Sequence, residues 1–222
     1  MLTLTEDTDG RGFTRIVVNE IHPTKIRRRP ADRFEKHNIK LKPWRTTGSY
    51  ILICPPTGFF TEAMGLNRSW LKDTMRMIRA NTDRPIRVRP KPGRTNIRPI
   101  YKAIKGITNA EVLSSSIDRP LEVDLKNAWA SVAPASATSI ESIIEGVPIF
   151  TELISPAQGI AVHDYRHIEH PIYPDREPLL YHLAYSQFEI REIESGYAFE
   201  FLLRDNKRMF KHVKRRKKME SK

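Results

Sequence analysis

Three hydroxyl-bearing side chains, Ser136, Thr138 and Ser139, lie in a turn of otherwise small residues between a short apolar run and a helical pattern. Small side chains let a ligand approach the backbone, and the first N–H groups of a helix have no partners inside that helix. These donors, the helix dipole and the hydroxyl groups together favour an anion, most often a phosphate. The alternative is that Thr138 or Ser139 only caps the helix.

Basic side chains occur in a strand predicted upstream of this turn. Residues 85–92 alternate apolar and basic side chains, which is typical of a strand and places Arg87 and Arg89 on the same face. Both lie toward the carboxyl end of that strand, where ligands bind in open α/β sheets. Arginine is suited to bidentate contact with phosphate. The alternative is a solvent-facing edge strand, which the prolines at its ends would permit.

The histidines do not form a recognisable metal-binding pattern. Four of them lie at positions 163, 167, 170 and 182, and none has an acidic partner in the spacing of the zinc-binding helices of metalloproteases. His163 and His167 are four residues apart, but prolines predict a loop there. The single cysteine, Cys54, excludes an internal disulfide and a multi-cysteine zinc site. We therefore expect neither a metal nor a permanently bound cofactor.

Strand and helix patterns alternate around these residues. Apolar runs and period-two alternation predict strands over residues 49–54, 85–92, 111–114, 129–133 and 149–151. Apolar residues at helical spacing predict helices over residues 69–80, 100–110, 121–128 and 140–147. A polar loop is predicted after the first of these strands. The alternation predicts an α/β fold with an open parallel sheet flanked by helices.

The two ends of the chain differ from this middle part. Residues 13–19 predict one strand, and residues 25–45 read as a basic arm or a loosely packed cover. Two final helices are predicted over residues 178–187 and 190–203, followed by a basic tail. We therefore divide the chain into an N-terminal strand and arm, one domain and a flexible tail, over residues 1–48, 49–203 and 204–222.

Charge is unevenly distributed along the 222 residues. Residues 106–203 hold 5 Lys/Arg against 15 Asp/Glu, whereas the rest of the chain holds 33 against 11. Three basic blocks, residues 25–45, 68–105 and the tail from residue 204, supply most of the excess. This segregation indicates a polyanionic partner such as DNA, although basic tails can also serve only solubility. The nucleic-acid contacts expected in the arm and the tail are Arg27, Arg28, Arg29, Lys214, Arg215 and Arg216.

The chain has no apolar run of about 18 residues, as a membrane span requires, and its start is no signal peptide. We therefore expect a protein without a membrane span that resides in the cytoplasm.

The order of several motifs resembles a known enzyme family. RVRPKP, PLEVDL, WASVAPASATSIESIIEGVPIF and SPA follow one another as in the C-terminal half of GT-B fold glycosyltransferases, nearest to the capsule-polysaccharide type and to small related bacteriophage proteins. The resemblance covers residues 49–203. It implies a single Rossmann-like domain that binds a nucleotide-sugar, with a basic N-terminal arm and a basic C-terminal tail.

The resemblance also implies roles for particular residues. Glu141, five residues before Gly146, would hold the ribose hydroxyls, and the turn over residues 136–139 would hold the diphosphate. Arg89 or Lys91 would neutralise the phosphates as the sugar leaves. The family's N-terminal acceptor domain has no counterpart in the 48 residues upstream. The acceptor side is then expected from the basic arm, a second subunit or a partner chain.

We therefore expect a nucleotide-sugar-dependent glycosyltransferase that acts on a polyanionic acceptor, first of all a modified base in phage DNA. Glu62, His163 and Asp164 lie in loops that could face the site, and they are the candidates for the catalytic base. One alternative is a non-catalytic nucleic-acid-binding protein on the same fold. Another is a surface-polysaccharide glycosyltransferase whose basic tail contacts the inner membrane.

Overall fold

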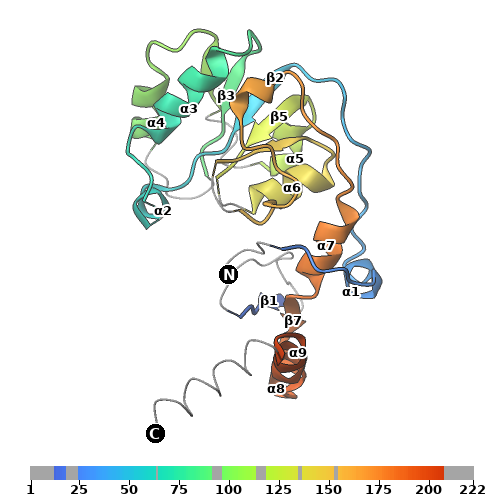
Figure 1. Ribbon diagram of the computed structural model, residues 1–222. Helices are drawn as coiled ribbons and strands as arrows, with labels where there is room; N and C mark the ends of the chain where they lie inside the picture. Colours follow the sequence, from blue (N-terminus) through green and yellow to red (C-terminus); the bar gives the residue numbers. More distant parts are fainter. Residues whose placement is uncertain are drawn as a thin grey trace, which may run out of the picture.

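A five-stranded parallel sheet forms the centre of the molecule (Figure 1). The computed structural model describes residues 13–18, 25–63, 65–91, 97–113, 119–134, 137–152 and 155–207. The strands are β2 (Tyr50–Ile53), β3 (Ile86–Val88), β4 (Ala110–Val112), β5 (Ala128–Val132) and β6 (Ile149–Phe150). Their order is β4-β3-β2-β5-β6. This arrangement confirms the predicted fold class, with strands close to the predicted ranges.

The chain changes direction across the sheet at its central strand. From β2 it proceeds to β3 and β4 on one side, and it then returns to build β5 and β6 on the other side. The loops that leave β2 and β5 therefore run in opposite directions, the topology that creates a crevice outside the carboxyl ends of the strands in open α/β sheets. In open α/β sheets such a crevice is where ligands bind.

Helices cover both faces of the sheet, and each face has its own core. On one face lie α3 (Trp70–Arg79), α4 (Arg98–Ile104) and the short helix η2 (Tyr165–His167). On the other lie α5 (Leu121–Leu125), α6 (Thr138–Ile144) and α7 (Glu177–Ala184). Apolar side chains on the inner face of α3, such as Met75 and Ile78, are fully buried. No helix among the described residues is long and apolar enough to span a bilayer.

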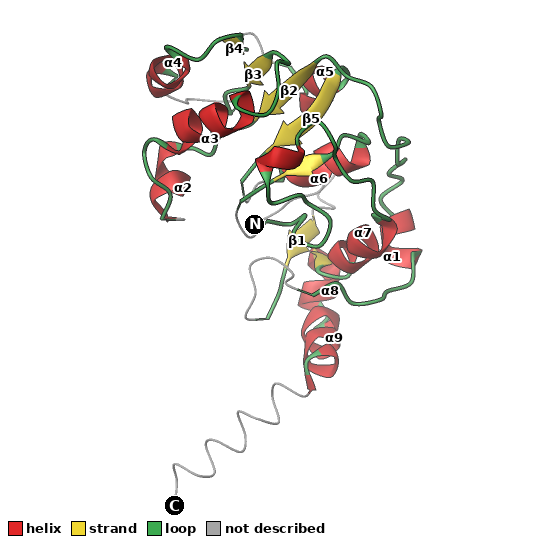
Figure 2. Cartoon of the chain, turned by 45° about the horizontal axis from the view of Figure 1, so that its top comes forward, coloured by secondary structure: helices red, strands yellow, loops and turns green. Residues whose placement is uncertain are grey.

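Segments near the two ends of the chain form a small second unit. Strand β1 (Phe13–Arg15) pairs antiparallel with β7 (Gln187–Glu189), and α8 (Ile190–Glu194) and α9 (Tyr197–Asp205) follow β7. Phe188, Ala198 and Leu202 form its buried core. Figures 1 and 2 show this unit below the large sheet, on the side toward which the carboxyl ends of the strands point. The helix predicted to extend to residue 187 ends earlier, because β7 begins there.

The basic arm is tied to the domain rather than loosely packed, which corrects the sequence interpretation. Helix α1 (Asp32–Glu35) packs on α7, and the buried Arg33 forms an ion pair with Glu192 at 2.8 Å. Lys42 forms an ion pair with Glu145 at 2.5 Å. The arm passes so close to Gly146, whose φ is +74°, that a Cβ there would overlap the backbone of Pro43.

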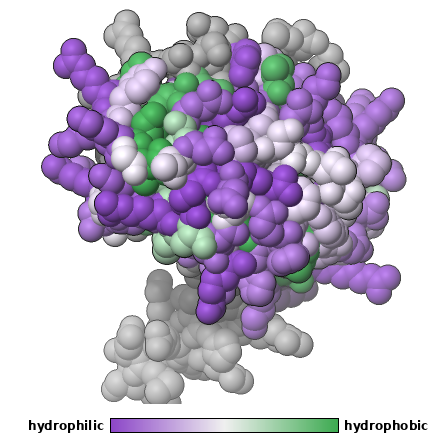
Figure 3. Space-filling model, turned by 90° about the horizontal axis from the view of Figure 1, so that it is seen from above, coloured by the Kyte–Doolittle hydropathy of each residue, from purple (hydrophilic) through white to green (hydrophobic). Residues whose placement is uncertain are grey.

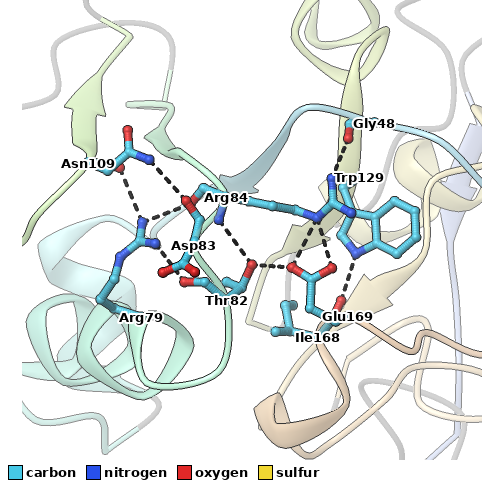
Figure 4. Close-up of polar contacts among 9 residues, drawn as sticks. All are labelled: Gly48, Arg79, Thr82, Asp83, Arg84, Asn109, Trp129, Ile168 and Glu169. Carbon is cyan, nitrogen blue, oxygen red and sulfur yellow. Dashed lines mark hydrogen bonds and ion pairs between the residues drawn. The ribbon is translucent and has the colours of Figure 1, made fainter.

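A polar network ties the amino ends of the strands together (Figure 4). The Nε of Arg84 donates to both carboxylate oxygens of Glu169 at 3.0 Å, and its Nη1 donates to the Gly48 carbonyl at 2.5 Å. The same guanidinium lies 4.1 Å from the ring centre of Trp129, whose indole N–H donates to the Ile168 carbonyl at 2.7 Å. Seen from above, this end of the molecule is mainly hydrophilic (Figure 3). The network therefore holds the amino ends of the strands in place, at the end of the sheet opposite to their carboxyl ends.

Candidate functional site

Arg87 and Arg89 lie on the same face of the sheet, as the alternation predicts. They alternate with the fully buried Ile86 and Val88, whose side chains belong to the core on the opposite face. Arg87 forms an ion pair with Glu111 at 2.6 Å, and its guanidinium stacks 4.2 Å from the centre of the Tyr50 ring. The Arg87 guanidinium therefore contacts side chains of both neighbouring strands, β4 and β2.

Arg89 lies at the carboxyl end of β3 and belongs to a buried charge cluster. It donates from Nη1 to the carboxylate of Asp124 on α5 and from Nη2 to the Arg119 carbonyl at 2.8 Å. Arg119 donates to the other oxygen of the same carboxylate. The Arg89 side chain is 6% exposed and that of Asp124 is 1% exposed. We call Arg89, Arg119 and Asp124 the Arg89 cluster; two guanidinium groups and one carboxylate give it a net positive charge.

Glu141 lies in the first turn of α6, close enough to the Arg89 cluster to interact with it electrostatically. Much of its side chain is exposed, yet the protein around the carboxyl group still displaces water and raises its pKa. Arg89 opposes that rise in the pKa, and Glu145 adds to it. The pKa of the neighbouring Cys54 thiol, at the end of β2, is raised to about 12 by burial and also responds to Arg89 and Glu141. These groups therefore surround the carboxyl end of β2.

The turn before α6 was predicted to present three hydroxyl groups, and the structure describes two of them. Ala137 occupies the N-cap position of α6 and has no side-chain acceptor. Neither Thr138 nor Ser139 is therefore the N-cap residue. Thr138 is half-buried, whereas Ser139 is fully buried and does not present its hydroxyl at the surface. Ser136 lies outside the described residues. Lys91 is exposed just beyond β3.

Glu62 and His163 lie on elements other than those that hold the Arg89 cluster. Glu62 is on α2 (Gly58–Ala63), a helix that forms where a loop was predicted, and it forms an ion pair with Arg68 at 3.2 Å. His163 is exposed beside β6, and its Nδ1 lies 2.6 Å from the Thr151 carbonyl oxygen. The α5–α6 face thus holds the Arg89 cluster and Glu141, whereas Glu62 lies on the α3–α4 face.

Asp164 has a local structural role. It caps η2 by accepting from the Arg166 N–H at 2.9 Å, and it forms an ion pair with the Arg166 side chain at 2.6 Å. These interactions lower the pKa of the Asp164 carboxyl group to about 2. A carboxylate with such a low pKa is a weak base near neutral pH. Of the three candidates, Asp164 is therefore the least suited to remove a proton.

The arginines of the arm are also used within the chain. Arg27 and Arg29 both form ion pairs with Asp205 of α9, and Arg29 lies 5.2 Å from the centre of the Tyr185 ring. Arg28 is exposed. The tail residues proposed to bind nucleic acid, Lys214, Arg215 and Arg216, lie outside the described residues. Among described residues the second basic block presents a group of exposed cations on and beside α3 and α4: Arg68, Arg76, Arg98, Lys102 and Lys105.

Sequence reasoning missed Asp124 and Arg119. Asp124 follows the buried Leu121 by three positions on α5, so helical spacing already placed its carboxylate on the inward side of a short helix. A buried carboxylate requires a cationic partner, and Arg89 was the basic residue predicted at the nearest strand end. Among the described residues, no three His, Cys, Asp or Glu side chains are grouped so that they could hold a metal ion.

No protein-family model matches the chain, and no curated protein matches it. One similar solved structure is KpsC of Thermosulfurimonas dismutans, described as a beta Kdo 2,4 transferase, with a TM-score of 0.45 and 14% sequence identity. The match covers 73% of this chain and 56% of that chain, so this chain spans little more than half of KpsC. The similarity is one of chain path alone and assigns no activity to this chain.

Proposed function

We propose that the crevice on the α5–α6 face binds a nucleotide-sugar and that the chain transfers its glycosyl group to an acceptor. The observation that carries this proposal is that the Glu141 carboxyl group and the buried Arg89 guanidinium lie within electrostatic reach of each other where the strand order reverses. A nucleotide-sugar offers partners for both groups. Ribose hydroxyls donate to a carboxylate, and phosphate oxygens accept from cationic or hydroxyl donors.

The positive charge near the crevice suits a diphosphate leaving group. When the bond between the sugar and the diphosphate breaks, negative charge develops on the leaving oxygen, and fixed donors stabilise it. The Arg89 cluster provides a positive field from within the fold, and Lys91 and Thr138 lie at the same edge of the sheet. The resemblance of residues 129–151 to the nucleotide-sugar motif supports the same assignment.

The proposed acceptor is anionic, and DNA with a modified base is one candidate. Exposed cations on α3 and α4 favour such a partner. The same cations favour a second candidate function, which is nucleic-acid binding without glycosyl transfer. An acceptor also needs a second wall, for which we propose the small unit of β1, β7, α8 and α9, a second copy of the chain or a partner chain.

Calorimetry with a panel of nucleoside mono- and diphosphate sugars tests the proposal. A ligand that binds wild-type protein should bind Glu141→Gln about 10- to 100-fold more weakly, because a hydrogen bond to a charged group contributes about 1.5–3 kcal/mol. Glu122→Gln is the matched control, since Glu122 is an exposed glutamate of α5. Glu145 would be a poor control because it holds Lys42 of the arm. Absence of binding by the whole panel would refute the proposed donor site.

A further inference from the structure

A cavity of about 540 Å³ opens beyond the carboxyl end of β2, on the face of the sheet opposite to the Arg89 cluster. It lies between α2, the start of α3 and α4. The lining includes Pro55, Pro56, Glu62, Arg68, Trp70 and Ile100. Its volume is within the range of small-molecule sites, about 300–1,000 Å³. The proposed donor site does not use this cavity, although both border the same strand end.

The inner wall of the cavity is apolar and held in place. Trp70 is 8% exposed, and its indole N–H donates to the Glu152 carboxylate at 3.2 Å. Ile100 of α4 is also buried, and the two prolines after β2 restrict the backbone of the opposite wall. A pyranose ring has a face of C–H groups that packs against aromatic and proline surfaces. The wall therefore suits a sugar ring better than a fully hydrated ion.

The rim of the cavity carries one carboxylate and one guanidinium group, and both side chains are largely exposed. Glu62 and Arg68 lie 3.2 Å apart, but their side chains are 64% and 90% exposed. Exposed ion pairs of this kind contribute little free energy, so a ligand can compete for both groups at small cost. The carboxylate can accept hydrogen bonds from hydroxyl groups, and the guanidinium can bind an anionic substituent through two parallel bonds.

Building on the proposed donor site, we propose that this cavity binds the acceptor as a saccharide, with Glu62 as the catalytic base. The acceptor hydroxyl oxygen forms a bond with the anomeric carbon of the donor sugar, and the bond from that carbon to the phosphate oxygen breaks. The bonding electron pair leaves with the phosphate, and the hydroxyl proton moves to the Glu62 carboxylate. Arg68 holds an acidic group of the acceptor. A concave site with an apolar wall fits one or two sugar rings, whereas duplex DNA requires an extended surface.

Saccharide binding can be measured without any donor, by saturation-transfer NMR with glucose, glucuronic acid and galacturonic acid. We expect the acidic sugars to bind wild-type protein and to bind Arg68→Ala about 10- to 100-fold more weakly, the loss of one charge-assisted contact. Arg76→Ala is the matched control, because Arg76 is an exposed arginine of α3 outside the cavity lining. The proposal is overturned if none of the sugars binds or if both variants bind alike. It is also overturned if a DNA duplex, and no sugar, shows the dependence on Arg68.

The catalytic part of the proposal needs a second measurement. Once a donor is known from calorimetry, Glu62→Gln should lower the turnover of transfer at saturating saccharide about 100-fold or more, while donor binding stays within about twofold. Turnover equal to that of wild type would remove Glu62 from the chemistry. Because saccharide binding and donor binding are measured separately, failure of the cavity and failure of the donor site give different results.

Discussion

The Arg89 cluster permits a sharp test of whether a buried charge group serves stability, function or both. Replacing Asp124 by Asn removes the carboxylate that forms the ion pair with Arg89, whose side chain is 6% exposed. Breaking one side of a buried ion pair costs about 3–5 kcal/mol, because the remaining charge stays away from water. The Asn oxygen can still accept one hydrogen bond, so we expect the lower end of this range, about 3 kcal/mol.

Urea denaturation followed by circular dichroism measures this loss directly. For a chain of this length a loss of about 3 kcal/mol also lowers the melting temperature by roughly 6–12 °C. The double variant Arg89→Met, Asp124→Leu should recover most of the lost free energy of unfolding, because a packed apolar pair often replaces a buried ion pair without loss. If the cluster also acts on phosphates, the double variant should still bind nucleotide-sugar more weakly than wild type.

Two results would refute this reasoning. A loss below about 1 kcal/mol in Asp124→Asn would mean that Arg89 is not desolvated as its burial implies. Full nucleotide-sugar affinity in the stable double variant would mean that the cluster is structural only. The exposed control Glu122→Gln should change neither the free energy of unfolding nor the affinity.

Three further outcomes are expected. The pKa of the Glu141 carboxyl group is raised above its ordinary value of 4.5, so this group becomes protonated at a higher pH than a free glutamate. Nucleotide-sugar affinity should therefore fall as the pH drops through the raised pKa. Calorimetry should find no such fall in Glu141→Gln. Glu169→Gln should lower the free energy of unfolding by about 1–2 kcal/mol through its bonds to Arg84, while leaving nucleotide-sugar affinity unchanged, which denaturation and calorimetry can check. If DNA contacts about six phosphates, its affinity should fall about a thousandfold between 50 and 200 mM salt, and Lys102→Glu with Lys105→Glu should flatten that slope in a filter-binding assay.

The sequence predicted the fold well where the apolar spacing was regular. Apolar residues repeat at helical spacing in α3 and α6, and Met75, Ile78, Ile140 and Ile143 are buried there. The strands of the parallel sheet are short and apolar, so they too were visible. Strand β7 was missed because three residues are too few to show a period, and its pairing with β1 depends on a distant segment.

The positions of the two strand arginines were predicted from the sequence, but the groups that they contact were not. The shared face of Arg87 and Arg89 follows from strand alternation, and the structure confirms it. Their counter-charges come from other elements, Glu111 on β4 and Asp124 on α5, and no local pattern reports such contacts. The same holds for the arm, whose arginines suggested a nucleic-acid surface although Asp205 neutralises two of them. Ligand roles of the remaining site residues stay predictions.

The pairing of β1 with β7 has a consequence for how the chain is made. Phe13 lies opposite Glu189, 176 positions later, so the first strand has no partner until most of the polypeptide has left the ribosome. The five parallel strands, all between residues 50 and 150, can assemble before that point. We expect nascent chains stopped before residue 187 to protect the large sheet from protease while residues 13–18 stay cleavable. Pairing of β1 with β7 would then be the last step of folding, and it could take place only after β7 has been synthesised.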